Sequence, residues 1–335
     1  MSRGESIGII APSSVTPRVE VALAVRTLEE SGFRIRVHKQ VFKRHHYFAG
    51  TDEERAKAFY EYATDSGIDV LWCARGGHGA LRILPLLDAL AGEHGAPSKQ
   101  KLLIGYSDAT ALMEYTRTRW GWSTLHGPMP SLKEFSALRY WKSLLEMILG
   151  RRAALPYERR KLRFVSAPPS SRIRGELTGG NLTLWAAMSG TPYAGAASGK
   201  IVFFEDVGEP LYRIDRTVQS LALAGAIQGA RALVLGTFED CSDSVPKVFS
   251  RAPRKRSRAA LLRPAARNLK PLRPVMQRAR ALRDIFGELG EKAGIPVATG
   301  LPVGHGPDYP PLPLGGIHSI HPDGSFRLES WTWLE

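Results

Sequence analysis

The chain has 335 residues, of which 43% are hydrophobic and 23% charged, proportions that exclude a disordered chain and leave room for two domains of ordinary size. Its net charge of +14 is concentrated in residues 247–283, which hold 13 Lys/Arg and no Asp/Glu, so the rest of the chain is nearly neutral and gives no sign of a nucleic-acid-binding surface. No run approaches the roughly 18 apolar residues of a membrane span, and no signal-peptide pattern opens the chain, so we expect a cytoplasmic protein.

The first half of the chain alternates strand and helix signals. Apolar runs typical of strands occur at residues 7–11, 70–74 and 102–106, and residues 34–37 also read as a strand. Helical patterns occur at residues 19–31, 51–64, 81–91 and 109–119. Thr51 and the acidic residues after it predict an N-cap and an acidic first helical turn. Strands that alternate with helices predict a parallel sheet covered on both faces, which is an α/β domain.

A second α/β unit is predicted after a break in this pattern. Residues 151–172 are rich in Arg, Pro and Ser and are expected to form a linker. The N-terminal domain is therefore expected to span residues 1–150 and a smaller C-terminal domain residues 173–335. Within the second domain we expect strands at 200–204 and 232–235, a helix at 214–223, and a closing hairpin at 317–320 and 325–328.

The basic segment, residues 247–283, divides into two parts. Residues 251–258 carry five Lys/Arg in eight positions, a composition that cannot bury a core, whereas residues 274–289 have helical character. A solvated surface loop is one interpretation, since charge runs are usually solvated. The alternative is an electrostatic tether for an acidic partner, such as nucleic acid or an anionic wall polymer.

The segment around Ser107 carries the clearest chemical signal. A buried strand ends at Gly105, Ser107 stands on the turn, and a helix begins directly after Asp108. In a nucleophile elbow this order exposes the serine hydroxyl at the carboxyl end of the sheet and places the next backbone N–H, that of Asp108, to stabilise an oxyanion. Because the last glycine of G-x-S-x-G is absent, an ordinary helix cap at Ser107 or Asp108 remains the alternative.

A glycine-rich turn follows another predicted strand. Residues 75–79 read Arg-Gly-Gly-His-Gly, and glycines at 76, 77 and 79 let the backbone approach a ligand closely and present its N–H groups. The turn is not a phosphate-binding P-loop, because no Gly-Lys-Ser/Thr follows, and it is a poor dinucleotide fingerprint. A tight strand-to-helix turn is the alternative, with His78 as a loop residue rather than a base.

Two later segments could supply an acid and a base. Glu205, Asp206 and Glu209 end an apolar strand, where carboxylates either serve a site at the sheet edge or act as helix caps and solvated loop charges. His305 lies between two glycines in a Pro-containing turn, which suits a general base, although a lone histidine is usually structural. Ser107, Glu205 and His305 follow the chain order of an α/β-hydrolase triad, which geometry has to confirm. No feature selects His45, His46, His94 or His318.

Taken together, these segments resemble the LD-carboxypeptidase (muramoyltetrapeptide carboxypeptidase) family of serine peptidases, which also includes microcin-immunity-type peptidases. The resemblance runs in order along most of the chain, and residues 247–283 are an insertion relative to the family pattern. The matching segments are residues 8–14, 47–52, 73–87, 105–112, 126–129, 177–182, 190–193, 204–216, 302–305 and 312–315.

The resemblance implies a fold, a site and a substrate. An N-terminal α/β domain would carry the nucleophile Ser107, a C-terminal α/β domain would carry the triad acid Glu205 and the base His305, and the triad would close between them. The oxyanion donors would be the backbone N–H groups of Asp108 and Gly77. The family implies a murein tetrapeptide substrate, cut between the L-centre of its diamino acid and a terminal D-Ala, and commonly a homodimer. It implies no metal and no organic cofactor, and Cys73 and Cys241 provide no metal-site spacing.

Two alternatives stay open at this stage. A microcin-immunity-type enzyme would hydrolyse peptidyl or aminoacyl adenylates with the same triad, although residues 179–182 and 190–193 look more like the carboxypeptidase branch. A non-enzymatic binding protein would use the basic segment as its contact surface. Competent residues at Ser107, Glu205 and His305 count against this second alternative.

Overall fold

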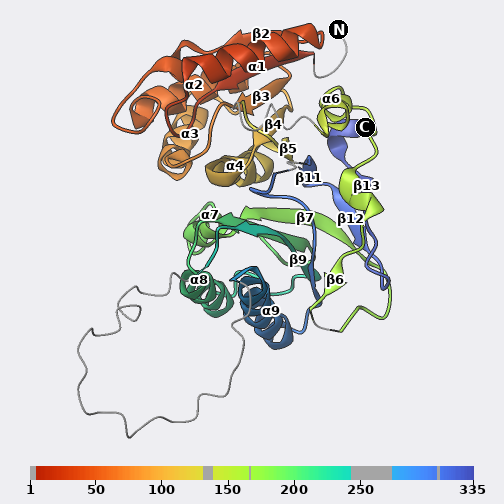
Figure 1. Cartoon of the computed structure of the whole chain (residues 1–335). Helices are drawn as coiled ribbons and strands as arrows, with labels where there is room; N and C mark the ends of the chain where they lie inside the picture. The colour runs from red at the N-terminus through yellow and green to blue at the C-terminus, as the bar shows by residue number, and fades with distance from the viewer. Residues whose placement is uncertain (1–4, 131–138, 166, 243–273, 308–309) are drawn as a thin grey trace, which may run out of the picture.

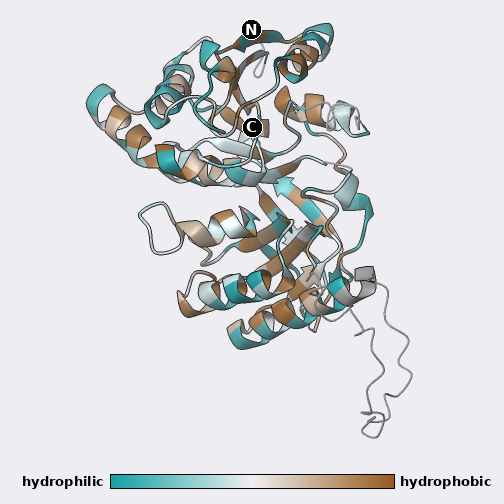
Figure 2. Cartoon of the chain, turned by 60° about the vertical axis from the view of Figure 1, so that its left-hand side comes forward, coloured by the Kyte–Doolittle hydropathy of each residue, from teal (hydrophilic) through white to brown (hydrophobic). Residues whose placement is uncertain are grey.

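The computed structural model describes residues 5–130, 139–165, 167–242, 274–307 and 310–335, and in them the chain forms two sheets, one above the other in Figure 1. Most of the basic segment, residues 247–273, lies outside the described residues. Apolar residues concentrate on the strands of both sheets, whereas the helices carry polar residues on their outer faces (Figure 2). No described helix is long and apolar enough to cross a membrane.

The first sheet has six strands in the order β11-β5-β4-β3-β1-β2. Five of them are parallel: β1 (Ser6–Ile10), β2 (Arg34–Val37), β3 (Val70–Cys73), β4 (Leu102–Gly105) and β5 (Ser123–His126). The sixth, β11 (Leu312–Leu314), comes from near the end of the chain and pairs antiparallel with β5. The helices of this part are α1 (Arg18–Glu30), α2 (Asp52–Thr64), α3 (Ala80–His94), α4 (Thr110–Trp120) and α6 (Trp141–Ile148).

The predicted strands and helices of the first half are confirmed to within a few residues. The residues of β1, β3 and β4 are fully buried, as the near-continuous hydrophobic runs of a covered parallel sheet require, whereas the edge strand β2 is partly exposed. Thr51 caps α2 in a capping box, because its hydroxyl accepts from the N–H of Glu54 and the Glu54 carboxylate accepts from the N–H of Thr51. The short strand β5 was not predicted.

The second sheet has seven strands in the order β13-β12-β7-β8-β9-β10-β6. Its parallel centre consists of β7 (Ile173–Asn181), β8 (Ile201–Val207), β9 (Ala232–Glu239) and β10 (Val297–Thr299). The predicted hairpin is present as β12 (Ile317–Ile320) and β13 (Phe326–Ser330), and the expected linker contains the 3₁₀ helix η3 (Pro156–Arg159) and the edge strand β6 (Arg163–Phe164). The helices are α7 (Leu182–Met188), α8 (Leu211–Leu223) and α9 (Pro274–Ala293), the last of which confirms the helical character expected after residue 274.

The two sheets meet where α4 packs against the end of β7. Gly180 has a φ of +142° there, and a Cβ at this position would lie 2.8 Å from Thr110, so the backbone contact requires glycine. The Asn181 N–H donates to the Thr110 hydroxyl at 3.1 Å. Arg117, also on α4, donates to the carbonyl of Leu177 at 3.2 Å and to the hydroxyl of Thr178 at 2.7 Å. These contacts connect the helix that follows Ser107 to the strand beside Glu205.

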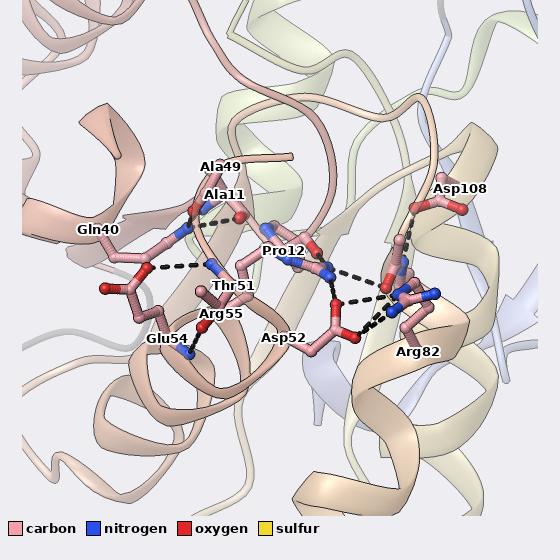
Figure 3. A network of polar contacts seen from close by, with 12 residues as sticks. Ala11, Pro12, Gln40, Ala49, Thr51, Asp52, Glu54, Arg55, Arg82 and Asp108 are labelled. Carbon is pink, nitrogen blue, oxygen red and sulfur yellow. Dashed lines mark hydrogen bonds and ion pairs between the residues drawn. The ribbon is translucent and has the colours of Figure 1, made fainter. Parts of the chain in front are cut away.

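A buried arginine ties together the loops of the first sheet (Figure 3). Arg55 on α2 is 1% exposed, and its guanidinium donates to the carbonyls of Pro12 and Gly79 and to the carboxylate of Asp52. Asp52 also pairs with Arg82 at 2.6 Å. Because Gly79 ends the glycine-rich turn, Arg55 links that turn to the loop after β1.

We predict that Arg55→Met lowers the free energy of unfolding by about 1–3 kcal/mol, since it leaves the buried carbonyl of Pro12 without a donor and removes one of the two donors of the Gly79 carbonyl, the other being the N–H of Arg82. Chemical denaturation would measure this. Arg82→Met is the matched control, because Arg82 pairs with the same carboxylate from a half-exposed position and should matter far less. Equal losses of unfolding free energy in the two variants would show that the buried hydrogen bonds of Arg55 contribute no more stability than the exposed ion pair of Arg82.

Candidate active site

Ser107 stands on a strained turn between β4 and α4. It opens the 3₁₀ turn η2 (Ser107–Ala109) with a φ of +59°, in the left-handed region that few non-glycine residues adopt. The side chain is partly exposed, whereas the next residue, Asp108, is buried and accepts from the N–H of Ala80 at 2.8 Å. A strained serine between a parallel strand and a helix is the geometry of a nucleophile elbow.

The glycine-rich turn lies directly against Ser107. A Cβ built on Gly76 would stand 3.2 Å from the Ser107 hydroxyl oxygen, and one on Gly77, whose φ is +103°, would overlap the Ser14 side chain. Glycine is therefore required at position 77, and a side chain at position 76 would crowd Ser107. The sequence had singled out Gly77, and the structure shows that Gly76 is the residue in contact with Ser107.

Two backbone donors near Ser107 are unused. Among the described residues, the N–H groups of Gly77 and Asp108 donate no hydrogen bond, whereas the neighbouring N–H of His78 is taken by the Ser14 hydroxyl at 3.3 Å. Unpaired backbone N–H groups beside a partly exposed hydroxyl can stabilise negative charge that develops on an oxygen bonded to that serine.

Glu205 and His305 form a close hydrogen-bonded pair at the second sheet. The Glu205 carboxylate at the end of β8 is fully buried, and its Oε2 lies 2.6 Å from Nδ1 of His305. Burial by itself would raise the pKa of Glu205, but contacts with the imidazoles of His126 and His305 outweigh it and lower that pKa to about 2. Glu205 is therefore a permanent anion that orients His305.

The loop that carries His305 is fastened to β9. The carbonyl of Val303 accepts from the N–H of Thr237 at 2.8 Å, and the Thr237 hydroxyl accepts from the N–H of Gly306 at 3.2 Å. Gly304 has a φ of +129°, and a Cβ there would lie 2.8 Å from the Glu205 carboxylate. The glycine before His305 is therefore required by the close approach of this loop to Glu205.

Aromatic contacts bring the two halves of the site together. Tyr106, the residue before Ser107, packs its ring against His305 at 4.7 Å between ring centroids and against His126 at 5.5 Å. His126, at the end of β5, places Nε2 3.9 Å from Oε1 of Glu205. No local pattern marks Tyr106 or His126 as part of a site, although both lie in segments that resemble the family, residues 105–112 and 126–129.

The other acidic candidates have structural partners. Asp206 accepts from the backbone N–H and the hydroxyl of Thr183 at 3.1 and 2.8 Å, at the start of α7, and from the amide of Asn181 at 2.9 Å. Glu209 lies 3.6 Å from Arg213, one turn along the chain in α8. Asp206 thus acts as a helix cap, and Glu205 alone of the three contacts a histidine in the described residues.

The remaining histidines lie away from this constellation. His45, His46, His78 and His94 are exposed. His318 is buried against Phe326, and burial lowers its pKa to about 4, so it is a neutral core residue at pH 7. In the described parts of the chain, no group of three or more His, Cys, Asp and Glu is arranged to hold a metal ion.

Comparisons with known proteins cover both halves of the chain. Residues 7–127 match the family model of the LD-carboxypeptidase N-terminal domain, and residues 174–320 match that of the LD-carboxypeptidase C-terminal domain. The murein tetrapeptide carboxypeptidase of Pseudomonas aeruginosa is 30% identical over 92% of this chain and 91% of its own length.

Two further relatives represent the two branches weighed from the sequence. The crystal structure of muramoyltetrapeptide carboxypeptidase from Oxalobacter formigenes superposes with a TM-score of 0.68 at 27% identity, covering 96% of each chain. The microcin C7 self-immunity protein MccF of Escherichia coli is 28% identical over 72% of this chain and 78% of its own length.

Proposed function

Because this chain belongs to the LD-carboxypeptidase family, we propose that it is a serine carboxypeptidase that removes the terminal D-Ala from murein tetrapeptides through Ser107, Glu205 and His305. The observation that carries the proposal is the buried Glu205–His305 pair, 2.6 Å apart, whose imidazole packs on the residue next to Ser107. A base oriented by a buried carboxylate beside a strained serine is the arrangement that serine hydrolases use.

The acylation step follows from these contacts. With Nδ1–H of His305 donated to Glu205, Nε2 keeps a lone pair and accepts the Ser107 proton as the serine oxygen attacks the carbonyl carbon. The backbone N–H groups of Gly77 and Asp108 are the proposed donors to the resulting oxyanion. His305 then returns its proton to the leaving amine as the carbon–nitrogen bond breaks.

Deacylation repeats the same proton transfers, with water in place of the serine as the nucleophile. His305 takes a proton from water, the hydroxide attacks the acyl-enzyme ester, and the proton goes back to Ser107 as the acid product leaves. Glu205 stabilises the imidazolium in both halves of the reaction.

The choice of a murein tetrapeptide rests on the names of the relatives in Pseudomonas aeruginosa and Oxalobacter formigenes. A cytoplasmic location would suit recycling of wall fragments, and assembly into a homodimer remains a prediction. The similarity to MccF favours one alternative, a hydrolase of peptidyl or aminoacyl adenylates.

Incubating the purified chain with tetrapeptides that differ in the third residue, and with an aminoacyl adenylate mimic, tests the proposal. We expect loss of the terminal D-Ala from a tetrapeptide, read by mass spectrometry, and no cleavage of the tripeptide product. Turnover of the adenylate mimic alone would assign the chain to the alternative.

A further inference from the structure

A cavity of about 300 Å³ lies between the start of α1, the end of the 3₁₀ helix η1 (Lys39–Phe42) with the two residues after it, and Arg75, the first residue of the glycine-rich turn. We call it the cationic cavity. Its wall includes Thr16, Arg18, Phe42, Lys43, Arg44 and Arg75. Four of these side chains are basic, and none of the described residues that line the cavity is acidic.

The positive charge of the cationic cavity is mostly uncompensated. Lys43 pairs with Glu54 at 2.5 Å. Arg18 stacks 4.4 Å above the Phe42 ring, and Arg44 donates to the carbonyl of His46. Within the described residues, Arg18, Arg44 and Arg75 have no carboxylate partner. Three unpaired guanidinium groups around one hollow favour an anion there.

The wall also holds an unsatisfied hydroxyl. Thr16 is only 8% exposed, and its hydroxyl has no hydrogen-bond partner among the described residues. The Thr16 oxygen has almost no accessible surface, so it is a buried unpaired group within the wall and is not itself a contact for a ligand in the cavity.

Arg75 connects the cationic cavity to the reacting centre. It is exposed, and it is covalently followed by Gly76, the residue against the Ser107 hydroxyl. The carbonyl of Gly76 accepts from the N–H of Ser14 at 3.2 Å, so the glycine-rich turn is hydrogen-bonded to the loop that continues into the cavity wall at Val15 and Thr16. An extended peptide residue spans only about 3.3–3.6 Å, so a group one residue beyond a carbonyl bound at Ser107 stays near the glycine-rich turn that begins with Arg75.

We propose that the cationic cavity binds the anionic leaving group of the substrate, with Arg75 as the residue that recognises the negative charge next to the scissile bond. This inference rests on the proposed function and refines it. Both candidate substrates share that chemistry, because a terminal D-Ala carries its carboxylate one residue beyond the cut and an acyl adenylate carries its phosphate directly beside it. Arginine pairs with carboxylate and phosphate in the same forked geometry.

Equilibrium binding to full-length Ser107→Ala protein tests this without turnover. The ligands are a murein tetrapeptide with a free C-terminal carboxylate, the same peptide as its C-terminal amide, adenosine monophosphate, and adenosine. We expect Arg75→Gln and Arg18→Gln to weaken binding of the free-acid peptide by about 10- to 100-fold and of the amide far less. If the two substitutions weaken the binding of adenosine monophosphate alone, the anion is a phosphate, and the proposal that the cavity binds an anion is kept.

Arg26→Gln is the matched control, because Arg26 also lies on α1 but is 78% exposed, pairs with Glu30 and is not in the cavity wall. The inference would be overturned by any of three results. Arg26→Gln could lose as much affinity as the cavity variants, the two cavity variants could bind every ligand as tightly as the parent protein, or no ligand could bind at all. Turnover is measured in parallel with the unmodified serine. If the wild-type protein hydrolyses the tetrapeptide but Arg75→Gln binds it as tightly as the unsubstituted protein does, the cavity does not bind the leaving group and the proposed function stands. If binding depends on the charge of the ligand but no substrate is turned over, the cavity binds the anion and the proposed function is wrong.

Discussion

Ser107→Ala is expected to abolish hydrolysis of the tetrapeptide, with kcat reduced by a factor on the order of 10⁶. Without the hydroxyl no acyl-enzyme can form, and only the catalysis supplied by binding and by the oxyanion donors remains. Alanine keeps the same backbone strain at a φ of +59°, so the fold should be retained. The measurement is single-turnover cleavage together with thermal unfolding.

Ser31→Ala serves as the control, because Ser31 caps the end of α1, where its hydroxyl donates to the carbonyl of Thr27. It should leave kcat unchanged. If a folded Ser107→Ala protein kept more than a few per cent of the wild-type rate, Ser107 would not be the nucleophile.

The second large effect is expected at Glu205. Glu205→Gln should lower kcat by roughly 10³–10⁴, since a neutral amide can neither stabilise the imidazolium of His305 nor enforce its tautomer. Asp206→Asn is the matched variant one residue along the same strand. It loses charge at the cap of α7, so it should reduce stability by about 1 kcal/mol and kcat only modestly.

Kinetics and denaturation of both variants separate the two roles. The prediction fails if both variants are fully folded and Asp206→Asn lowers kcat more than Glu205→Gln does.

The pH dependence provides a further check. Because the pKa of Glu205 is lowered from 4.5 to about 2, the stability that its ionised form contributes is complete above pH 4.5 and is lost only as the pH falls toward 2. A loss of activity between pH 5 and 7 therefore cannot come from protonation of Glu205.

Local sequence was sufficient for most of the first domain. Apolar runs, the capping box at Thr51 and the glycines that end helices specify their own conformations, and the observed strands and helices agree with them. The order of Ser107, Glu205 and His305, supported by a family resemblance, was enough to propose the triad. Strand β5 was missed because Leu125 is the one aliphatic residue in Ser123–His126, so no apolar run marks the strand.

Long-range contacts decided the rest, because they depend on which distant segments fold against each other. β11 joins the first sheet from near the end of the chain, and the Glu205–His305 pair joins residues 100 positions apart. Neither the packing of Tyr106 on His305 nor the uncompensated arginines of the cationic cavity has a local pattern. Sequence by itself determined which residue types were available for catalysis. The tertiary structure decided that Glu205 faces His305 and that Asp206 caps a helix, because adjacent residues of a strand point to opposite faces.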